Sequence, residues 1–441
     1  YYRDLSSRAS TSAQTQLVRQ GLLGWSAGAW TADIKATRYQ TLQPDPANLV
    51  ARPYELMPQF NLTGWQALAG DLTGVLTAQY TDFQHPDSDR IEARRTVLYP
   101  QLAWPNVRPW GYVTPKIGLH LTRYSFAGDA AEAAGLPDAY RREVPIASLD
   151  SGLVFERQSR WFDKDLTQTL EPRLFYLYVP LRDQSFLTNN QINFDSGIAD
   201  FNFAQIFSEN LFTGQDRIAD ANQLTVAVGS RFIEPDNGVE RLNVTLGQRF
   251  YFAPQTVTLS PGDSRRTERK TDLLGAASGR VSDSVWVDGG MQYNPRDGRM
   301  ERSYLGTRWL AGTGRSLSAS YRLVREQTAP FDIAIEQLDI AGQWPIFGGW
   351  QGVGRYNYAI DESRPIEVIA GLEYRADCWS VRTVLQRYAT TADDTVSAVF
   401  IQLELTDFSR IGSSPLELLR RSVPGYGRAD QSVSDPVFGN P

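Results

Sequence analysis

Histidine is the side chain most often used for proton transfer near neutral pH, and this sequence has two, His85 and His120. A hydrolase would pair one of them with a serine or an aspartate, so an enzyme is one hypothesis. His85 stands beside Pro86 in a link between regular segments, whereas His120 alternates with Leu119 and Leu121 as the polar position of a strand. Neither histidine belongs to a nucleophile motif, so we expect no catalytic residue.

The sequence also has few residues that could bind a metal or form a disulfide. Cys378 is the one cysteine, and with two histidines it leaves too few soft ligands for a structural zinc site or a disulfide within the chain. The sequence also has no nucleotide-binding glycine-rich loop. We therefore expect no metal and no cofactor.

The charge pattern excludes a generic nucleic-acid-binding protein. The net charge is −6, and the 44 basic residues, of which only four are lysines, form no cluster that could release counterions from a phosphate backbone. Apolar runs are also short, because none approaches the roughly 18 to 20 consecutive residues that a membrane-spanning helix needs. The sequence therefore predicts neither a nucleic-acid partner nor a helical membrane protein.

Alternation of apolar and polar residues at period two is the dominant pattern, and it is typical of strands with two unlike faces. Leu242, Val244, Leu246 and Phe250, for example, alternate with Asn243, Thr245, Gly247 and Arg249. The sequence contains about nineteen such runs, each of about ten to fourteen residues. Their centres lie near residues 20, 36, 60, 76, 97, 118, 151, 173, 226, 246, 276, 289, 305, 321, 339, 355, 370, 384 and 401.

The length of these runs decides between two architectures. Any single run fits a half-buried strand of a soluble sandwich or propeller, but soluble strands usually have about five or six residues. A strand that crosses a bilayer at a tilt needs about nine to eleven. We therefore predict an all-β fold, a large antiparallel transmembrane β-barrel over residues 1–412, with apolar positions facing lipid and polar positions facing a wet lumen.

The links between the runs alternate in length. Shorter links fall near residues 29, 69, 107, 162, 236, 283, 313, 347 and 376, and long ones at 43–54, 125–144, 180–220 and 253–270, with a brief 295–298 link in the long class by order. Outer-membrane barrels have short periplasmic turns and longer outer loops, so we place the short links and Cys378 in the periplasm. The periplasmic tail, 413–441, has capping-box spacing from Ser414 to Glu417 and should form a short helical turn.

Charged residues on the polar positions of the strands are candidate lumen residues. They are Glu171, Arg173, Arg231, Arg249, Arg322, Arg355, Arg375 and Arg382. Arginine on the lipid face would cost about 2–4 kcal/mol near the midplane, which favours the lumen for each of them. From the residues alone, we expect them to form a solvated, mutually paired wall of the lumen. His120 should face the same wet interior.

The 180–220 link is too long to be a plain connection. A loop of about forty residues in a compact barrel is usually functional or folded inward. Asp216 and Arg217 stand within its specific string GQDRIADANQLT, which begins at Gly214. We expect these two residues to order the loop, so that it caps the barrel from outside.

Several strings resemble the barrel domain of the LptD family of lipopolysaccharide-assembly proteins. They are TLEPRLFYLYVPLRDQS from Thr169, the Gly214 string, YRADCWSVR from Tyr374, FIQLEL from Phe400 and SSPLELLRRSVPGY from Ser413, with RPYELMPQF from Arg52 as a further similar segment. The resemblance implies a barrel of roughly twenty-six strands, so we expect this sequence to be a C-terminal piece of the barrel.

The resemblance also implies function and partners. It implies that lipopolysaccharide is inserted into the outer leaflet of the outer membrane, with a plug lipoprotein inside the barrel and a periplasmic lipopolysaccharide bridge that reaches a missing N-terminal domain. It also offers alternatives for two sets of residues: the lumen arginines would contact the plug or the phosphates of the passing glycolipid, and the 180–220 loop would grip the plug. The lipid leaves sideways at a seam between the first and last strands, and Val399, Ile401, Leu403 and Leu405 lie on the predicted last strand. Cys378 is expected to form a disulfide with a residue outside this sequence.

Composition and alternation alone leave a passive porin or substrate-specific channel open as the alternative. The quoted strings are what favour the translocon over that channel.

Overall fold

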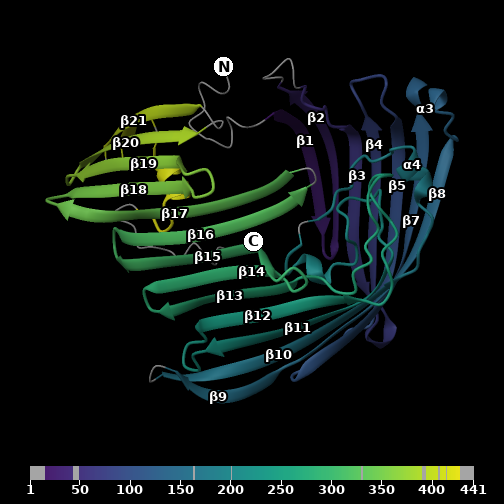
Figure 1. The fold of residues 1–441 in the computed structure, drawn as a ribbon, viewed down its shortest axis with the longest axis horizontal. Coiled ribbons are helices and arrows are strands. Elements are labelled where there is room, and N and C mark those ends of the chain that lie inside the picture. The colour runs from purple at the N-terminus through teal and green to yellow at the C-terminus, as the bar shows by residue number, and fades with distance from the viewer. Residues whose placement is uncertain are drawn as a thin grey trace.

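The computed structural model describes residues 15–42, 49–161, 164–199, 201–328, 331–389, 394–405, 408–413 and 415–427. Within them, one antiparallel sheet of 22 strands curves into the wall of a barrel (Figure 1). The predicted all-β, large antiparallel barrel fold is confirmed, and each of the nineteen predicted centres falls inside a strand.

The strands follow the chain in order. They are β1 (Gln16–Ala27), β2 (Trp30–Thr41), β3 (Glu55–Ala67), β4 (Thr73–Gln84), β5 (Glu92–Ala103), β6 (Asn106–Arg108), β7 (Gly111–Ala127), β8 (Ala139–Leu153), β9 (Phe155–Trp161), β10 (Lys164–Val179), β11 (Ala221–Ile233), β12 (Glu240–Tyr251), β13 (Leu273–Ser282), β14 (Val285–Asn294), β15 (Arg299–Gly312), β16 (Arg315–Thr328), β17 (Phe331–Phe347), β18 (Trp350–Ala359), β19 (Arg364–Arg375), β20 (Trp379–Ala389), β21 (Thr395–Leu405) and β22 (Ser409–Gly412). The helices are short: η1 (Ala69–Asp71), α3 (Asp129–Ala133), α4 (Ser185–Asn189), η2 (Gln205–Phe207) and α5 (Leu416–Ser422). Among the described residues, no helix is long and apolar enough to cross a membrane.

Two short strands, β6 and β9, each continue a longer strand after a break in its backbone pairing. β6 pairs with β7 as a continuation of β5, and β9 pairs with β10 as a continuation of β8. The breaks fall at Trp104–Pro105 and at Val154. Proline cannot donate to a ladder, which accounts for the first break. Several strands exceed the expected fourteen residues, because β7 and β17 have 17 each and β10 has 16.

The two edges of the sheet are not joined in the described part of the chain. β1 pairs with β2 alone, and at the other edge β22 pairs with β21. The prediction that the strand containing Val399 and Ile401, β21, is the last strand was wrong, because β22 lies beyond it. Four residues are too few to produce a visible alternation, so β22 left no signal.

The long links differ in part from the prediction. The link predicted at 125–144 is shorter, since β7 runs to Ala127 and β8 begins at Ala139, while 180–220 is as predicted. After β14 the alternation of link lengths fades, because the β14–β15 and β18–β19 links span only 295–298 and 360–363. The prediction that 295–298 is the one brief link of the long class was therefore wrong, because the 360–363 link is brief as well.

The two faces of the sheet have different surroundings. Apolar side chains such as Ile117, Leu174, Leu305 and Leu385 are exposed on the convex face, at 45 to 60% of their surface. The concave face is covered in part by the 180–220 link and by the C-terminal segment, 415–427, both visible inside the curve of the sheet (Figure 1). An apolar outer band around a polar interior is the pattern of a barrel surrounded by lipid.

All eleven tryptophans lie within four residues of a short link. They are Trp25, Trp30, Trp65, Trp104, Trp110, Trp161, Trp286, Trp309, Trp344, Trp350 and Trp379. Because the strands are antiparallel, the short links share one rim of the wall. Tryptophan concentrates where a membrane meets water, so this rim is suited to one interface of a bilayer.

The C-terminal segment folds back onto the concave face. Leu418, Leu419 and Val423 pack against apolar positions of β17 to β20, among them Ile369 and Val384. The predicted helical turn corresponds to α5, whereas Ser414 of the capping box lies outside the described residues. The tail thus becomes part of the inner wall near the rim of short links.

Candidate functional site

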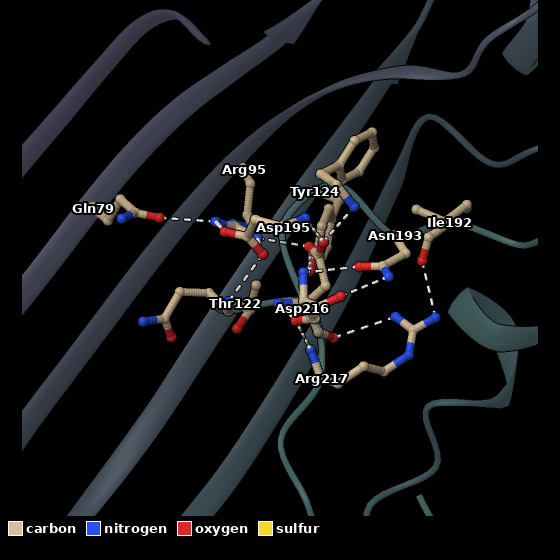
Figure 2. Close-up of polar contacts among 12 residues, drawn as sticks. Gln79, Arg95, Thr122, Tyr124, Ile192, Asn193, Asp195, Asp216 and Arg217 are labelled. Atoms are coloured by element: carbon tan, nitrogen blue, oxygen red, sulfur yellow. Dashed lines mark hydrogen bonds and ion pairs between the residues drawn. The ribbon is translucent and has the colours of Figure 1, made fainter. Parts of the chain in front are cut away.

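The 180–220 link is the largest irregular segment, and it docks on the inside of the wall formed by β4 to β12. It carries α4 and η2, and an isolated bridge pairs Ile198 with Phe212. Figure 2 shows where its central string meets β5 and β7. The link folds onto the inner side of the wall, so the expectation that it caps the barrel from outside was wrong, while the expectation that it grips a plug stays a prediction.

Asp216 is the centre of this contact and is completely buried. Its Oδ1 accepts hydrogen bonds from Arg95 Nη1 at 2.6 Å and from the Tyr124 hydroxyl at 2.7 Å. Its Oδ2 accepts the backbone N–H groups of Phe194 at 2.6 Å and Asp195 at 3.0 Å (Figure 2). Four donors thus satisfy one carboxylate without water.

Arg95 connects this carboxylate to a second one. Its guanidinium donates to Asp195 Oδ1 at 2.8 Å and to Oδ2 at 2.5 Å, and it also reaches Gln79 Oε1 on β4 at 2.8 Å. A buried charge is tolerated when it is paired and hydrogen-bonded, and Arg95 has both kinds of contact. Two acidic residues of the loop, Asp195 and Asp216, therefore share one arginine of the wall.

The electrostatics of Asp216 follow from these neighbours. Burial alone raises the pKa of a carboxyl group, but the Arg95 guanidinium and the hydrogen bonds from Tyr124, Asp195 and Phe194 outweigh it. The pKa of Asp216 is held below its ordinary value, so the side chain is a carboxylate at any physiological pH. For Arg217, burial lowers the pKa of the guanidinium.

A second wall arginine holds the backbone of the same string. Arg142 Nη1 donates to the Asp216 carbonyl at 2.6 Å, and Nη2 donates to the Gln215 carbonyl at 2.7 Å. His120 lies next to it, with Nε2 at 2.8 Å from Gln215 Oε1. His120 is 3% exposed, so the expectation of a histidine in a wet lumen was wrong: the docked loop excludes water from it.

Arg217 turns the other way, toward the neighbouring long link. Its Nη2 donates to the Ile192 carbonyl at 2.9 Å, and its Nε donates to the Thr258 carbonyl at 3.3 Å. Asp220 adds a parallel connection, since it accepts the backbone N–H groups of Thr256 and Val257. Asp216 and Arg217 therefore have separate tasks: the first joins the loop to the wall, the second joins it to the 252–272 link.

Gly214 makes this packing possible. Its φ is +66°, and a Cβ at this position would lie 2.3 Å from the Asp195 carbonyl oxygen. Only glycine combines that backbone conformation with so close an approach. The glycine of the string is thus a structural requirement of the docked loop.

The middle of the loop is attached farther along the sheet. Arg249 Nη2 donates to the carbonyls of Gln205 and Ile206 at 2.8 and 2.6 Å. The guanidinium of Arg173 lies 3.9 Å from the ring centroid of Phe207. Two of the candidate lumen arginines therefore contact the protein's own loop.

The other candidates lie on the same face, and several are paired there. Glu171 and Arg231 form an ion pair at 2.6 Å. Arg355 is bound by Asp339 at 2.5 Å and also pairs with Glu367, and Arg382 is bound by Glu373 at 2.9 Å and Glu404 at 3.0 Å. Arg375 ends β19 beside the cavity that Glu373 lines, and Arg322 lines a cavity with Phe201 and Asn202.

Cys378 and the predicted seam residues of β21 lie away from the docked loop. Cys378 is exposed in the turn between β19 and β20. Val399 and Ile401 are exposed by 62 and 58% on the convex face, and Leu403 and Leu405 continue their row along β21. His85, by contrast, packs edge-on against Tyr54, with ring centroids 4.9 Å apart, and Tyr54 in turn contacts Phe194 of the 180–220 link. Among the described residues, no group of histidine, cysteine and acidic side chains is arranged to hold a metal ion.

Sequence reasoning missed Arg95, Arg142 and Asp195. Arg95 shares its strand face with Ala93 and Val97, and Arg142 shares its face with Val144 and Ile146. These faces read as apolar because the docked loop makes them a core. An arginine interrupting such an apolar row was the available signal.

The comparisons agree with this architecture. The family model described as "LptD: LPS transport system D" matches residues 1–350. The chain belongs to the LptD family. An LPS-assembly protein LptD from Azoarcus sp. is 44% identical over 100% of this chain and 53% of its own length. The relative from Aromatoleum aromaticum is 46% identical over 100% and 53%, and that from Thiobacillus denitrificans 42% identical over 99% and 57%.

The chain therefore spans about half the length of the curated LptD relatives that it matches. Among solved structures, a ferric enterobactin receptor from Pseudomonas aeruginosa aligns over 88% of this chain and 69% of its own, with a TM-score of 0.37 and 11% identity. An alignment at that level supports no inference about function.

Proposed function

We propose that this chain forms the barrel wall of a lipopolysaccharide translocon in the outer membrane and helps to insert the lipid into the outer leaflet without covalent chemistry. Membership of the LptD family carries the proposal. Because the chain spans about half of its relatives, lipid export is an activity of the longer protein to which such a wall belongs. The chain itself acts as a conduit and not as an enzyme.

The inner wall supports a translocon over a passive porin. A porin needs an open, water-filled channel, whereas here the 180–220 link covers the concave face of β4 to β12 with buried contacts such as Arg95 to Asp216. The remaining polar side chains of that face suit a plug lipoprotein. A periplasmic lipopolysaccharide bridge would reach the barrel through a domain beyond this chain.

Lateral exit at a seam between the first and last strands is the proposed route of the lipid. β22 pairs only with Gln402 to Leu405, so the outer edge of β21 from Thr395 to Phe400 has no strand partner among the described residues. An edge with few hydrogen bonds can open at less cost than a fully paired one. The apolar row that includes Val399 and Ile401 faces the lipid at this edge.

A disulfide lock tests this route in the full-length protein. A cysteine at Val399 joined to one on the first strand should stop lipopolysaccharide from reaching the surface while the barrel stays assembled. The matched control joins Leu305 to Tyr321, which face each other across β15 and β16 in the middle of the sheet, away from the seam. Normal surface lipopolysaccharide with the seam fully locked would eliminate lateral exit and favour a lumenal route.

Cys378 is proposed to form a disulfide with a cysteine elsewhere in the longer protein. Its thiol is exposed at a turn on the rim of short links, and exposed thiols in the periplasm are readily oxidised. Non-reducing electrophoresis of the full-length protein should show a mobility shift that Cys378→Ser abolishes. An identical oxidised pattern in the variant would show that this thiol is free.

A further inference from the structure

A cavity of about 560 Å³ lies on the concave face, between β13 to β18 and the C-terminal segment. Arg280, Trp286 and Arg308 line it from the wall, and Arg421 lines it from α5. None of its lining residues belongs to the 180–220 link, so this cavity is separate from the docked loop. Its volume is within the range of about 300–1,000 Å³ that small-molecule sites usually have.

The wall side of the cavity is a row of donors across three strands. The guanidinium groups of Arg280 and Arg308 each lie 5.2 Å from the ring centroid of Trp286. Trp286 and Arg308 are direct partners in the register of β14 and β15. Contact with the aromatic ring holds both guanidinium groups in fixed positions, as a preorganised site requires.

Two buried donors of this row have no acceptor among the described residues. They are Nε of Arg280 and Nε1 of Trp286. Within the part of the chain that the structure describes, the one hydrogen bond of the Arg280 guanidinium runs from Nη2 to the Asp283 carbonyl, at 2.7 Å. A buried donor without a partner destabilises the fold, so a bound molecule that brings acceptor oxygens would remove this penalty.

Three acidic residues line the cavity, Glu240, Asp288 and Asp339, and among the described residues none of them accepts a hydrogen bond from Arg280 or Trp286. Asp339 is taken by Arg355 at 2.5 Å, and Asp288 accepts a hydrogen bond from the Tyr304 hydroxyl. Arg421 forms no hydrogen bond or ion pair with the part of the chain that the structure describes. The cavity therefore offers fixed arginines and an indole N–H to a ligand that carries negative oxygen atoms.

We propose that this cavity binds a phosphorylated sugar. The guanidinium forks match phosphate oxygens, and the rest of the cavity, lined by Ser318, Ser320 and Tyr304, can accommodate the hydroxyl groups of a saccharide. The inference rests on the proposed function, because the phosphate-bearing head group of the transported glycolipid has this chemistry. A free sugar phosphate has the same chemistry.

Direct binding to the full-length complex in detergent tests the site without any transport. Equilibrium dialysis with radiolabelled glucosamine 1-phosphate should show saturable binding, and unphosphorylated glucosamine should not bind. Arg280→Gln and Arg421→Gln should each weaken binding about tenfold or more, whereas Arg296→Gln, an exposed arginine in the 295–298 link, should leave it unchanged. Arg421 lies on the exposed side of α5, so its variant reports on the site with the wall intact.

Competition identifies the source of the ligand. Displacement of the probe by lipopolysaccharide, but not by its dephosphorylated form, would assign the site to the glycolipid. Displacement by free sugar phosphates alone would overturn that assignment. No phosphate-dependent binding, or equal binding by all variants, would overturn the site itself. Neither result depends on lipid export, so failure of the site and failure of the proposed function remain distinguishable.

Discussion

The carboxylate of Asp216 lies 2.6 Å from the guanidinium of Arg95, although 121 positions separate the two residues, and both side chains are fully buried. A buried ion pair stabilises a fold only when its remaining hydrogen-bonding groups are satisfied. Asp216 fulfils this condition with three further donors. The pair makes the long loop an integral part of the wall.

Removing the charge of Asp216 should release the loop. Asp216→Asn leaves Arg95 buried with one carboxylate fewer, and breaking a buried pair from one side costs about 3–5 kcal/mol. We expect faster proteolysis within 180–220 of the purified protein, while the sheet keeps its heat resistance on electrophoresis. Asp236→Asn, at an exposed position of the β11–β12 link, is the matched control and should behave like the unmodified protein.

The same pair predicts how the loop responds to pH. The pKa of Asp216 is lower in the folded protein, so its contribution is fully present above the ordinary value near 4 and is lost as the pH falls through the lower folded value. Proteolysis of the loop should therefore be constant from about pH 5 to 8. Loosening within that window would contradict a permanently ionised Asp216.

Gly214 provides a sharper test, because a matched glycine exists. Gly214→Ala places a methyl group 2.3 Å from the Asp195 carbonyl oxygen, in addition to about 1–2 kcal/mol for the left-handed backbone. Gly238→Ala has a similar φ of +71° with nothing within 4 Å. Only the first should expose the loop to protease. Equal effects of the two variants would show that backbone conformation alone, and not the close approach, explains this glycine.

The strands were predictable because each carries its own alternation. The pattern failed where a strand is short, as in β22, and where a strand is broken, as at Pro105 and at Val154. The docked loop was predictable in part, since the Gly214 string marked Asp216 and Arg217 as ordered. Their partners were not, because Arg95 and Arg142 become neighbours of this string only when β5 and β8 close around it.

The inner wall shows the same limit at the other end of the chain. Ile369 and Val384 lie on the lumen-facing side of β19 and β20, where the alternation predicts polar residues in contact with water. Their apolar side chains contradict a fully wet lumen. They are apolar because α5 covers them, and nothing within those strands indicates that a segment from the C-terminus returns to this face. Contacts between distant segments cannot be inferred from the periodicity of either one.

The packing of α5 should depend on Leu419, whose side chain is 1% exposed and packs against Ile369 and Val384 of the wall. Leu419→Ala removes buried methyl groups at a cost of about 2–5 kcal/mol, enough to detach a helix of seven residues. We expect faster tryptic cleavage at Arg420 and Arg421 in the purified protein. Glu417→Ala, exposed on the same helix, should leave the cleavage rate unchanged; equal rates for the two variants would argue against the docked segment.

The orientation of the wall can be tested on intact cells. The 234–239 link belongs to the tryptophan-rich rim of short links, whereas the 252–272 link lies at the opposite rim. Asp236 and Ser260 are both exposed, so in a Cys378→Ser background a cysteine at either position is equally reactive in detergent. A membrane-impermeant thiol reagent should label the cysteine at Ser260 and spare the one at Asp236, because short turns face the periplasm. The reverse pattern would invert the topology and would also move Cys378 to the cell surface, away from any periplasmic disulfide partner.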